Sequence, residues 1–187
     1  MKPASKTAAS VRILAGRWRG KRLEVPRSAR PTSGRAREAL FDILQGSVVE
    51  GRVLDLYAGS GAIGLEALSR GAAQAVFVET DRKALEVNLA RCAPAAGSVQ
   101  VIVADARRAI DRLAREKRFF DLVFADPPYS RGVSALTGSI GQLVAPGGWL
   151  VLQTDADREA PEIAGFAEAE RRAYARNVFW IFERTGA

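Results

Sequence analysis

The run Asp126-Pro127-Pro128-Tyr129 directly follows four apolar residues and is the strongest chemical signal in this 187-residue sequence. Consecutive prolines lack backbone donors and stiffen the chain, so the carbonyl of Pro127 can be held in a fixed direction. The exocyclic amine of a nucleobase is a poor nucleophile because its lone pair is delocalised into the ring. If Asp126 and the Pro127 carbonyl accept the amine hydrogens, the nitrogen can pyramidalise and attack an activated methyl group, while Tyr129 stacks on the extruded base. The run therefore predicts methyl transfer to a base amine, with a rigid turn capped by an aromatic ring as the alternative.

A glycine turn, Asp55-Leu56-Tyr57-Ala58-Gly59-Ser60-Gly61, follows one predicted strand and opens a helix. Glycines at such a turn let a ligand approach the backbone, although Gly-x-Gly turns also bind dinucleotides or simply pack a helix on a sheet. The carboxylate at the strand end favours S-adenosylmethionine over NAD, because it attracts the ammonium group of the first and repels the pyrophosphate of the second. Gly64, the third glycine of a dinucleotide pattern, falls inside the predicted helix, so the fit to a dinucleotide loop is imperfect.

Two further acids end the next two predicted strands. Glu79 lies twenty residues after Gly59 and can accept both hydroxyls of an adenosine ribose, and Asp105 can accept the adenine amino group. Each acid alone could be an ordinary strand-end or helix-capping residue. Acids at three successive strand ends on one edge of a sheet favour a shared ligand. The predicted cofactor-binding residues are Asp55, Tyr57, Gly59, Gly61, Glu79, Asp105 and Ala106.

The net charge of +7 is concentrated at the N-terminus. Residues 1–37 hold eleven Lys or Arg against one acid, whereas the other 150 residues hold 17 bases and 20 acids. A polyanionic partner explains such a cluster because Lys and Arg neutralise phosphates, and the alternative is a solvated basic tail. Apolar residues interleave with bases over residues 11–25, which predicts a hairpin with one apolar and one cationic face. The predicted RNA-binding residues are Arg12, Arg17, Trp18, Arg19, Lys21, Arg22, Arg30 and Arg35.

Short apolar runs alternate with helical patterns from residue 51 onward, which predicts an α/β fold with a largely parallel sheet between two helical layers. The predicted strands are 53–56, 75–78, 99–103, 122–125, 149–153, 167–174 and 178–184, of which the last two form an antiparallel hairpin at the sheet edge. The predicted helices are 33–44, 61–69, 81–91, 107–116 and 133–143. We expect a disordered tail over residues 1–10, a basic RNA-binding extension and helix over 11–46, and a methyltransferase domain over 47–187.

The composition excludes several kinds of chemistry. The chain has no His and a single Cys, so no intrachain disulfide can form, and the usual zinc, Ser-His-Asp and Cys-His arrangements cannot be assembled. We therefore expect no metal. Cytosine-C5 methylation needs a cysteine nucleophile, and Cys92 falls at the end of a predicted helix, away from the site. Every apolar run is too short to span a membrane and no signal peptide is recognisable, so we expect a cytoplasmic protein without a membrane partner.

The sequence resembles the RsmD family of 16S rRNA guanine-N2 methyltransferases over residues 11–185. The resemblance is carried by the glycine turn, by the run from Gly64 to Ala72 and by residues 126–129, and it is most specific in the segments 12–23, 30–32 and 35–41. It implies a Rossmann-like class I methyltransferase fold, with a seven-stranded sheet whose last strand is antiparallel. It implies S-adenosylmethionine as cofactor and S-adenosylhomocysteine as product. It also implies methylation of N2 of a guanine in 16S rRNA, on an assembling or assembled 30S particle, by a protein that we expect to be monomeric.

Two other functions compete with this interpretation. A DNA adenine-N6 methyltransferase could use the same Asp-Pro-Pro-Tyr geometry, but such enzymes usually carry a sizeable target-recognition insert, for which this chain has no room. A non-catalytic RNA-binding protein could keep the fold, but it would need neither an acid at each strand end nor an intact run over residues 126–129. A base-amine methyltransferase accounts for all of these features.

Overall fold

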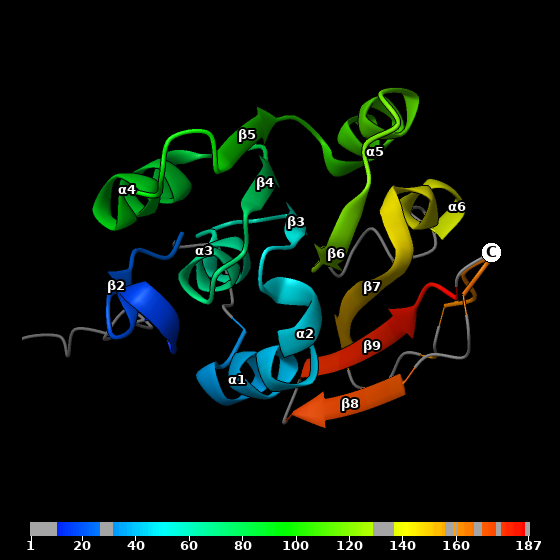
Figure 1. The fold of residues 1–187 in the computed structure, drawn as a ribbon, viewed down its shortest axis with the longest axis horizontal. Helices are drawn as coiled ribbons and strands as arrows, with labels where there is room; N and C mark the ends of the chain where they lie inside the picture. The colour runs from blue at the N-terminus through cyan, green and yellow to red at the C-terminus, as the bar shows by residue number, and fades with distance from the viewer. Residues whose placement is uncertain are drawn as a thin grey trace, which may run out of the picture.

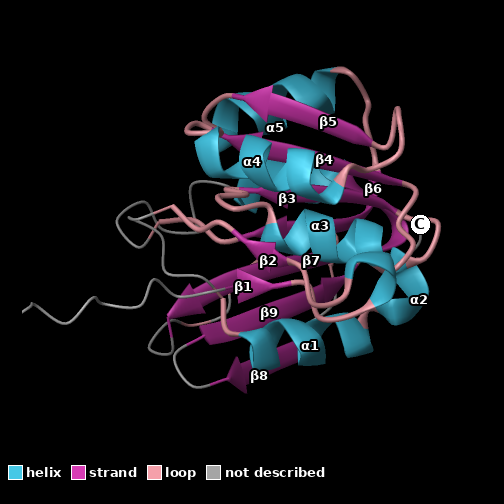
Figure 2. Cartoon of the chain, turned by 90° about the vertical axis from the view of Figure 1, so that its left-hand side faces the viewer, coloured by secondary structure: helices cyan, strands magenta, loops and turns pink. Residues whose placement is uncertain are grey.

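A seven-stranded sheet forms the centre of the computed structural model, which describes residues 11–26, 32–128, 137–155, 159, 161–166, 170–174 and 177–185. The strand order is β5-β4-β3-β6-β7-β9-β8, and Figure 2 shows the strands stacked in this order. Strands β3 to β7 are parallel, whereas β9 runs antiparallel to its neighbours β7 and β8. The strands are β3 (Arg52–Leu56), β4 (Gln74–Glu79), β5 (Val99–Val103), β6 (Phe120–Ala125), β7 (Val144–Asp155), β8 (Glu170–Tyr174) and β9 (Asn177–Glu183). The predicted α/β fold with an antiparallel last strand is confirmed.

Helices cover both faces of the sheet (Figures 1 and 2). One layer contains α1 (Gly34–Ile43), α3 (Ala62–Ser69) and α4 (Lys83–Cys92); the other contains α5 (Ala106–Arg115), α6 (Thr137–Ile140) and the 3-10 helix Gly141–Leu143. A short helix, α2 (Gln45–Val48), precedes β3. Successive strand residues point to opposite faces, so Val53 packs with the α3 layer while Leu54 and Leu56 pack with the α5 layer. Asp55 therefore lies on the α3 side of the sheet.

The basic N-terminal segment forms a hairpin of β1 (Val11–Arg12) and β2 (Arg22–Leu23), joined through the 3-10 helix Gly16–Trp18. Its apolar side chains are buried in the same core cluster as α1, α3 and the sheet; they are Val11, Ile13, Trp18 and Leu23. The hairpin and its apolar face are thus confirmed. The domain boundary near residue 46 stays a prediction, and one apolar core runs across it. The expected tail over residues 1–10 lies outside the described residues.

Strand β7 is longer than the sequence predicts. The segment 146–148 is Pro-Gly-Gly, which is typical of a turn, yet β7 continues through it by bulging away from β6. Phe120 is opposite Val144, whereas Leu122 is opposite Trp149, so the bulge absorbs the extra residues. Gly147 has a φ of 72°, a left-handed value that suits glycine.

The remaining elements differ little from their predicted ranges. The helix expected over 133–143 is present over 137–143 as α6 and the following 3-10 helix, and residues 129–136 lie outside the described residues. The predicted strand at 122–125 begins two residues earlier, at Phe120. Within the described ranges, no helix is long and apolar enough to cross a membrane.

Candidate active site

The turn from β3 into α3 is shaped by three residues with left-handed backbone angles. Tyr57, Gly59 and Gly61 have φ values of 60°, 54° and 74°. A Cβ on Gly61 would lie 2.5 Å from Cδ1 of Leu85, so a larger residue would have to displace that side chain in addition to adopting the left-handed backbone angle. A Cβ on Gly59 would meet nothing closer than 3.9 Å, which leaves this side of the turn open to a ligand. The left-handed angle of Tyr57 is uncommon for a non-glycine residue, and such angles cluster at functional sites.

The carboxylate of Asp55 lies beneath this turn and is only 2% exposed. Its Oδ2 accepts a 3.0 Å hydrogen bond from the backbone N–H of Gly64 in α3. Burial raises the pKa of Asp55 from its ordinary value of 3.8 to about 7; the N–H of Gly64 opposes this effect, and the negative charges of Glu79 and Asp126 add to it. The hydrogen bond from Gly64 therefore does not offset the cost of burying the ionised carboxylate. A cationic group of a ligand would stabilise it.

The parallel register places Glu79 and Asp126 level with Tyr57, on either side of the glycine turn. Leu56 is opposite Val78 in β4 and Ala125 in β6, so the next residue of each strand falls at the same height. In β5, Val103 is opposite Glu79, and Asp105 follows two residues later. Four predicted acids thus come together at the carboxyl ends of four adjacent strands, which face the left side of Figure 2; they are Asp55, Glu79, Asp105 and Asp126.

Glu79 and Asp105 make hydrogen bonds that organise this edge of the sheet. The Oε2 of Glu79 accepts the backbone N–H of Gly59 at 2.7 Å, which ties the end of β4 to the glycine turn. The Oδ1 of Asp105 accepts the N–H of Arg107 at 3.0 Å and so caps α5, of which Ala106 is the first residue. Asp105 is therefore a helix cap, which is one of the two roles that the sequence predicts for it. Its contact with adenine, and that of Glu79 with ribose, stay predictions.

Asp126 is held by a side chain that no local sequence pattern singles out. Its Oδ2 accepts a 3.1 Å hydrogen bond from Nε2 of Gln153, a buried residue of β7. Burial raises the pKa of Asp126 from 3.8 to about 7, and the negative charge of Asp155 adds to this effect. Pro127 is buried and Pro128 is exposed. The fourth residue of the predicted run, at position 129, lies outside the described residues.

Two of the predicted site residues lie outside the described residues. They are Tyr129, which is predicted to be catalytic, and Arg30, which is predicted to bind RNA. In the described part of the chain, no group of three or more potential metal ligands comes together.

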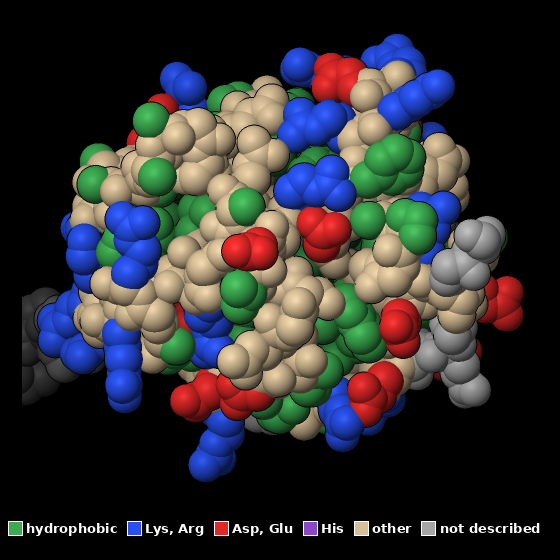
Figure 3. Space-filling model, viewed as in Figure 1, with side chains coloured by type: hydrophobic (Ala, Val, Ile, Leu, Met, Phe, Trp, Pro, Cys, Tyr) green, Lys and Arg blue, Asp and Glu red, His purple; other side chains and the backbone are tan. Residues whose placement is uncertain are grey.

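Five of the predicted RNA-binding residues are exposed, namely Arg12, Arg17, Arg19, Arg22 and Arg35. Figure 3 shows Lys and Arg side chains gathered on the side of the molecule where Figure 1 draws β2. Lys21 is half-buried, and its Nζ donates to the carbonyl of Arg91 at the end of α4.

Trp18 requires a correction. Its ring is 5% exposed and packs in the apolar core, with the guanidinium of Arg17 lying 4.7 Å from the ring centroid. An indole that is buried in this way cannot stack on an RNA base. Trp18 instead anchors the hairpin to the domain.

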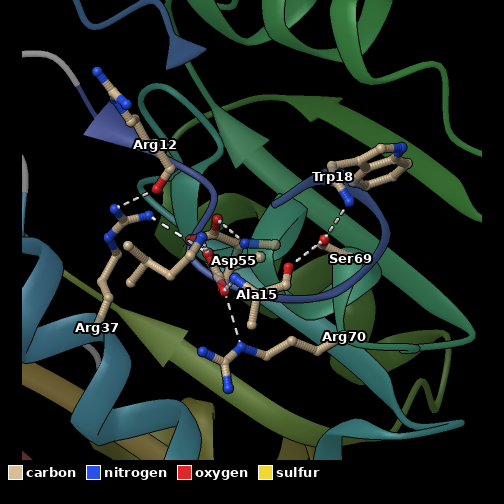
Figure 4. A network of polar contacts seen from close by, with 10 residues as sticks. Arg12, Ala15, Trp18, Arg37, Asp55, Ser69 and Arg70 are labelled. Carbon is tan, nitrogen blue, oxygen red and sulfur yellow. Dashed lines mark hydrogen bonds and ion pairs between the residues drawn. The ribbon is translucent and has the colours of Figure 1, made fainter. Parts of the chain in front are cut away.

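A buried network fastens the hairpin to α3 (Figure 4). Glu66 is fully buried and accepts the N–H groups of Leu14 at 2.7 Å and Ala15 at 3.0 Å, together with Nε of Arg70 at 2.9 Å. The guanidinium of Arg37, which is also buried, lies 4.0 Å from Glu66. Burial lowers the pKa of Arg37, and the charge of Glu66 opposes this effect. The hairpin is therefore an integral part of the domain.

Asn88 of α4 connects the hairpin to the glycine turn. Its Oδ1 accepts the N–H of Glu24 at 2.8 Å, and its Nδ2 donates to the carbonyls of Glu24 at 2.8 Å and Ser60 at 2.9 Å. On the other side, Oγ of Ser69 accepts the N–H of Trp18 at 3.0 Å. No sequence pattern singles out Glu66, Ser69 and Asn88, because each lies within an ordinary helical pattern, where a polar residue is expected to face solvent.

The sheet order, the glycine turn after β3 and the acids at adjacent strand ends define a Rossmann-like α/β methyltransferase. Solved structures agree with this class. A putative methyltransferase, yhhF, from Escherichia coli has a TM-score of 0.81 and 32% identity, covering 96% of this chain and 100% of that one. A putative methylase from Haemophilus influenzae has a TM-score of 0.74 and 27% identity, covering 95% and 99%.

Sequence comparisons identify the family. A family model described as Conserved hypothetical protein 95 matches residues 11–183. Ribosomal RNA small subunit methyltransferase D of Escherichia coli strain K12 is 42% identical over 154 residues, covering 80% of this chain and 74% of that protein. Putative rRNA methyltransferase YlbH of Bacillus subtilis strain 168 is 32% identical over 185 residues, covering 94% and 100%. The chain belongs to this family, the RsmD methyltransferases.

Proposed function

We propose that this protein transfers a methyl group from S-adenosylmethionine to the exocyclic N2 of a guanine in 16S rRNA. The observation that carries the proposal is the position of Asp126, which directly follows β6, level with the glycine turn, and lies close enough to Asp55 to raise the pKa of that residue. A cofactor on the turn and a base held by Asp126 would meet at one sheet edge. The names of the relatives, which describe small-subunit rRNA methyltransferases, support the substrate class.

The residues around the turn fit a sulfonium cofactor. S-adenosylmethionine supplies a methyl group activated by a positively charged sulfur. Gly59 leaves one side of the turn open, and the under-compensated carboxylate of Asp55 suits a ligand that carries an ammonium group. Glu79 is assigned to the ribose hydroxyls, and Asp105 with Ala106 to the adenine. Each of these assignments rests on the place of the residue at the carboxyl edge of the sheet.

Asp126 is assigned two tasks in the reaction. As an ionised acceptor it binds one hydrogen of the guanine N2 amine, and the carbonyl of Pro127 binds the other, so that the nitrogen lone pair is directed at the methyl carbon. After the new C–N bond has formed, the nitrogen must lose a proton. A carboxyl with a pKa of about 7 can accept that proton near neutral pH. Tyr129 is assigned to stacking on the guanine.

The basic hairpin is proposed to bind the rRNA backbone through its exposed arginines. Its tip, at Gly16 to Trp18, packs on the carboxyl end of α3, whereas the glycine turn lies at the amino end of that helix. The eight residues of α3 span about 12 Å, so an RNA that contacts both must extend along this face of the protein. Structured rRNA, on an assembling or assembled 30S particle, satisfies this requirement. We further propose that the protein acts as a cytoplasmic monomer.

The proposal is tested with tritiated S-adenosylmethionine and small-subunit particles from cells that lack the enzyme, followed by nucleoside analysis. Label should appear as N2-methylguanosine with the wild-type protein. Asp126→Ala should lower turnover by about 100-fold or more, because it removes a group that acts on the transferring proton. Its affinity for S-adenosylhomocysteine, measured by calorimetry, should stay close to that of the wild type.

Asp121→Ala is the matched control. Asp121 is an acid at the other end of the same strand, where its carboxylate binds the N–H and guanidinium of Arg52. Its substitution should leave turnover unchanged. Label in N6-methyladenine of DNA would favour the rival enzyme, and equal loss of cofactor affinity and turnover in Asp126→Ala would contradict the role given to that carboxylate.

A further inference from the structure

We infer that Gln153 is a positioning residue that orients the carboxylate of Asp126 for its substrate, and that Thr32 orients Gln153 in turn. This inference rests on the proposed function of Asp126. Gln153 lies near the carboxyl end of β7, is 4% exposed and donates from Nε2 to Oδ2 of Asp126 at 3.1 Å. The hydroxyl of Thr32 donates to Oε1 of the same amide at 2.8 Å. A relay of two hydrogen bonds therefore runs from the segment before α1 to the end of β6.

The partners on both sides of the amide determine which way it faces. Oε1 receives the hydroxyl of Thr32, and Nε2 faces two oxygen atoms, Oδ2 of Asp126 and, at 3.5 Å, Oδ1 of Asn177 in β9. An amide rotated by 180° would place its oxygen against the carboxylate, which is repulsive. Gln153 is thus used as a donor toward Asp126, and its side chain is fixed from three elements of the fold.

A donor at Oδ2 has two effects on Asp126. It fixes the rotation of the carboxylate, so Oδ1 is the oxygen left to accept a hydrogen from the base. It also favours the ionised form, in an environment where burial and the negative charge of Asp155 disfavour that form and raise the pKa of Asp126. Because proton acceptors must be placed to within a fraction of an ångström, loss of this donor should affect the chemical step more than binding.

The position of Thr32 gives the relay a second consequence. Thr32 follows the basic hairpin and directly precedes the N-cap of α1, Ser33, whose hydroxyl accepts the N–H of Ala36 at 3.2 Å. Thr32 of the N-terminal extension therefore acts on the catalytic carboxylate through Gln153, which lies 121 residues further along the chain. The extension contributes to the geometry of the reaction as well as to RNA binding.

The experiment measures single-turnover methylation of small-subunit particles at saturating protein, as a function of pH, for five full-length variants, one of which is Asp126→Ala. Gln153→Met keeps the volume and removes the donor; it should lower the single-turnover rate constant by about 10- to 100-fold with little change in RNA affinity. It should also move the rising limb of the pH–rate profile to higher pH, because the carboxylate loses a hydrogen bond that favours its ionised form. Thr32→Val should reduce the rate in the same direction but less, and Thr32→Ser should restore it.

Thr154→Val controls for general disturbance of β7. Its hydroxyl accepts Nε1–H of Trp180 at 3.0 Å and donates to the backbone carbonyl of Asp155 at 3.1 Å, and neither bond involves Asp126, so this variant should lose stability without a change in the pH profile. If Gln153→Met keeps the wild-type rate and pH profile while Asp126→Ala is inactive, the positioning role is wrong and the proposed function stands. If Asp126→Ala itself keeps its turnover, the proposed function fails first.

Discussion

Replacing Asp55 with Asn should make the protein more stable and its cofactor site weaker. Asn is close to isosteric with Asp, and its side-chain oxygen can still accept the N–H of Gly64 that Oδ2 of Asp55 now binds at 3.0 Å. What the substitution removes is a buried negative charge, 2% exposed, that lies near the negative charges of Glu79 and Asp126. The substitution therefore distinguishes how much this charge destabilises the fold from how much it contributes to binding a cationic ligand.

The size of the effect follows from the pKa. Burial raises the pKa of Asp55 from 3.8 to about 7. An acid whose pKa is higher in the folded state than in the unfolded state favours folding while it is protonated. This contribution to stability is complete below the pKa of the unfolded state, and it is lost as pH rises from about 4 to about 7. At about 1.4 kcal/mol per pH unit, the ionised carboxylate costs the fold at most about 4 kcal/mol above pH 7, and less than about 2 kcal/mol at pH 5. For a protein of this size, 4 kcal/mol corresponds to a rise in Tm of the order of 10 °C.

The assay is calorimetric unfolding of the wild type and Asp55→Asn at pH 5 and pH 8, with S-adenosylhomocysteine titrated into the folded proteins. The gain in Tm should be larger at pH 8 than at pH 5. Affinity for the ligand should fall by about 10- to 100-fold, which corresponds to the loss of one charged hydrogen bond. Asp126→Asn is the matched control, because the pKa of Asp126 is also about 7: it should show a similar pH-dependent gain in stability while keeping its affinity for the ligand.

Two results would refute this reasoning. If Asp55→Asn is no more stable than the wild type at pH 8, the ionised carboxylate does not destabilise the fold, and another interaction offsets the cost of its burial. If it is stabilised but binds S-adenosylhomocysteine as tightly as the wild type, Asp55 does not interact with a cationic group of the cofactor.

Two further predictions concern the N-terminal extension. Changing the four hairpin bases Arg17, Arg19, Lys21 and Arg22 to Ala should weaken RNA binding and reduce the salt slope by about 3, because each lost phosphate contact lowers the slope by about 1 and Lys21 is already engaged with the carbonyl of Arg91. The charge control replaces three exposed bases on the opposite helical layer, Arg108, Arg112 and Arg115, and an equal loss there would mean that only net charge matters. Glu66→Ala should lower the free energy of unfolding by about 3–5 kcal/mol, because it strands the charges of Arg37 and Arg70 and two backbone N–H groups. Urea denaturation measures this loss, and hydrogen exchange should show it first in residues 11–25; unchanged protection there would contradict the anchoring role of Glu66.

The order of elements and the edge that bears the site were predictable from local patterns. Apolar runs of four to six residues alternate with helical periodicity, and this alternation is enough to indicate a parallel sheet between helices. Because the carboxyl ends of parallel strands share one edge, the acids at positions 55, 79, 105 and 126 could be assigned to one site before any distance was known. The glycine turn and the Asp-Pro-Pro run were recognisable because their chemistry depends on adjacent residues.

Tertiary structure alone decided which polar residues serve the fold and which serve the site. Trp18 is interleaved with exposed bases in the sequence, yet its ring is buried against the core because the hairpin packs flat on α3. Glu66 lies in an apolar helix without any mark of function, and it is buried because two backbone N–H groups of the hairpin reach it.

The same limit applies to the relay from Thr32 through Gln153 to Asp126. These residues are separated by up to 121 positions, and a local pattern reports only on residues within a turn or two of each other. The sequence by itself therefore determined the sheet, the motif-bearing edge and the kind of chemistry expected there. The folded chain decided how the carboxylate of Asp126 is oriented, because hydrogen bonds between distant elements form only once the sheet has brought their ends together.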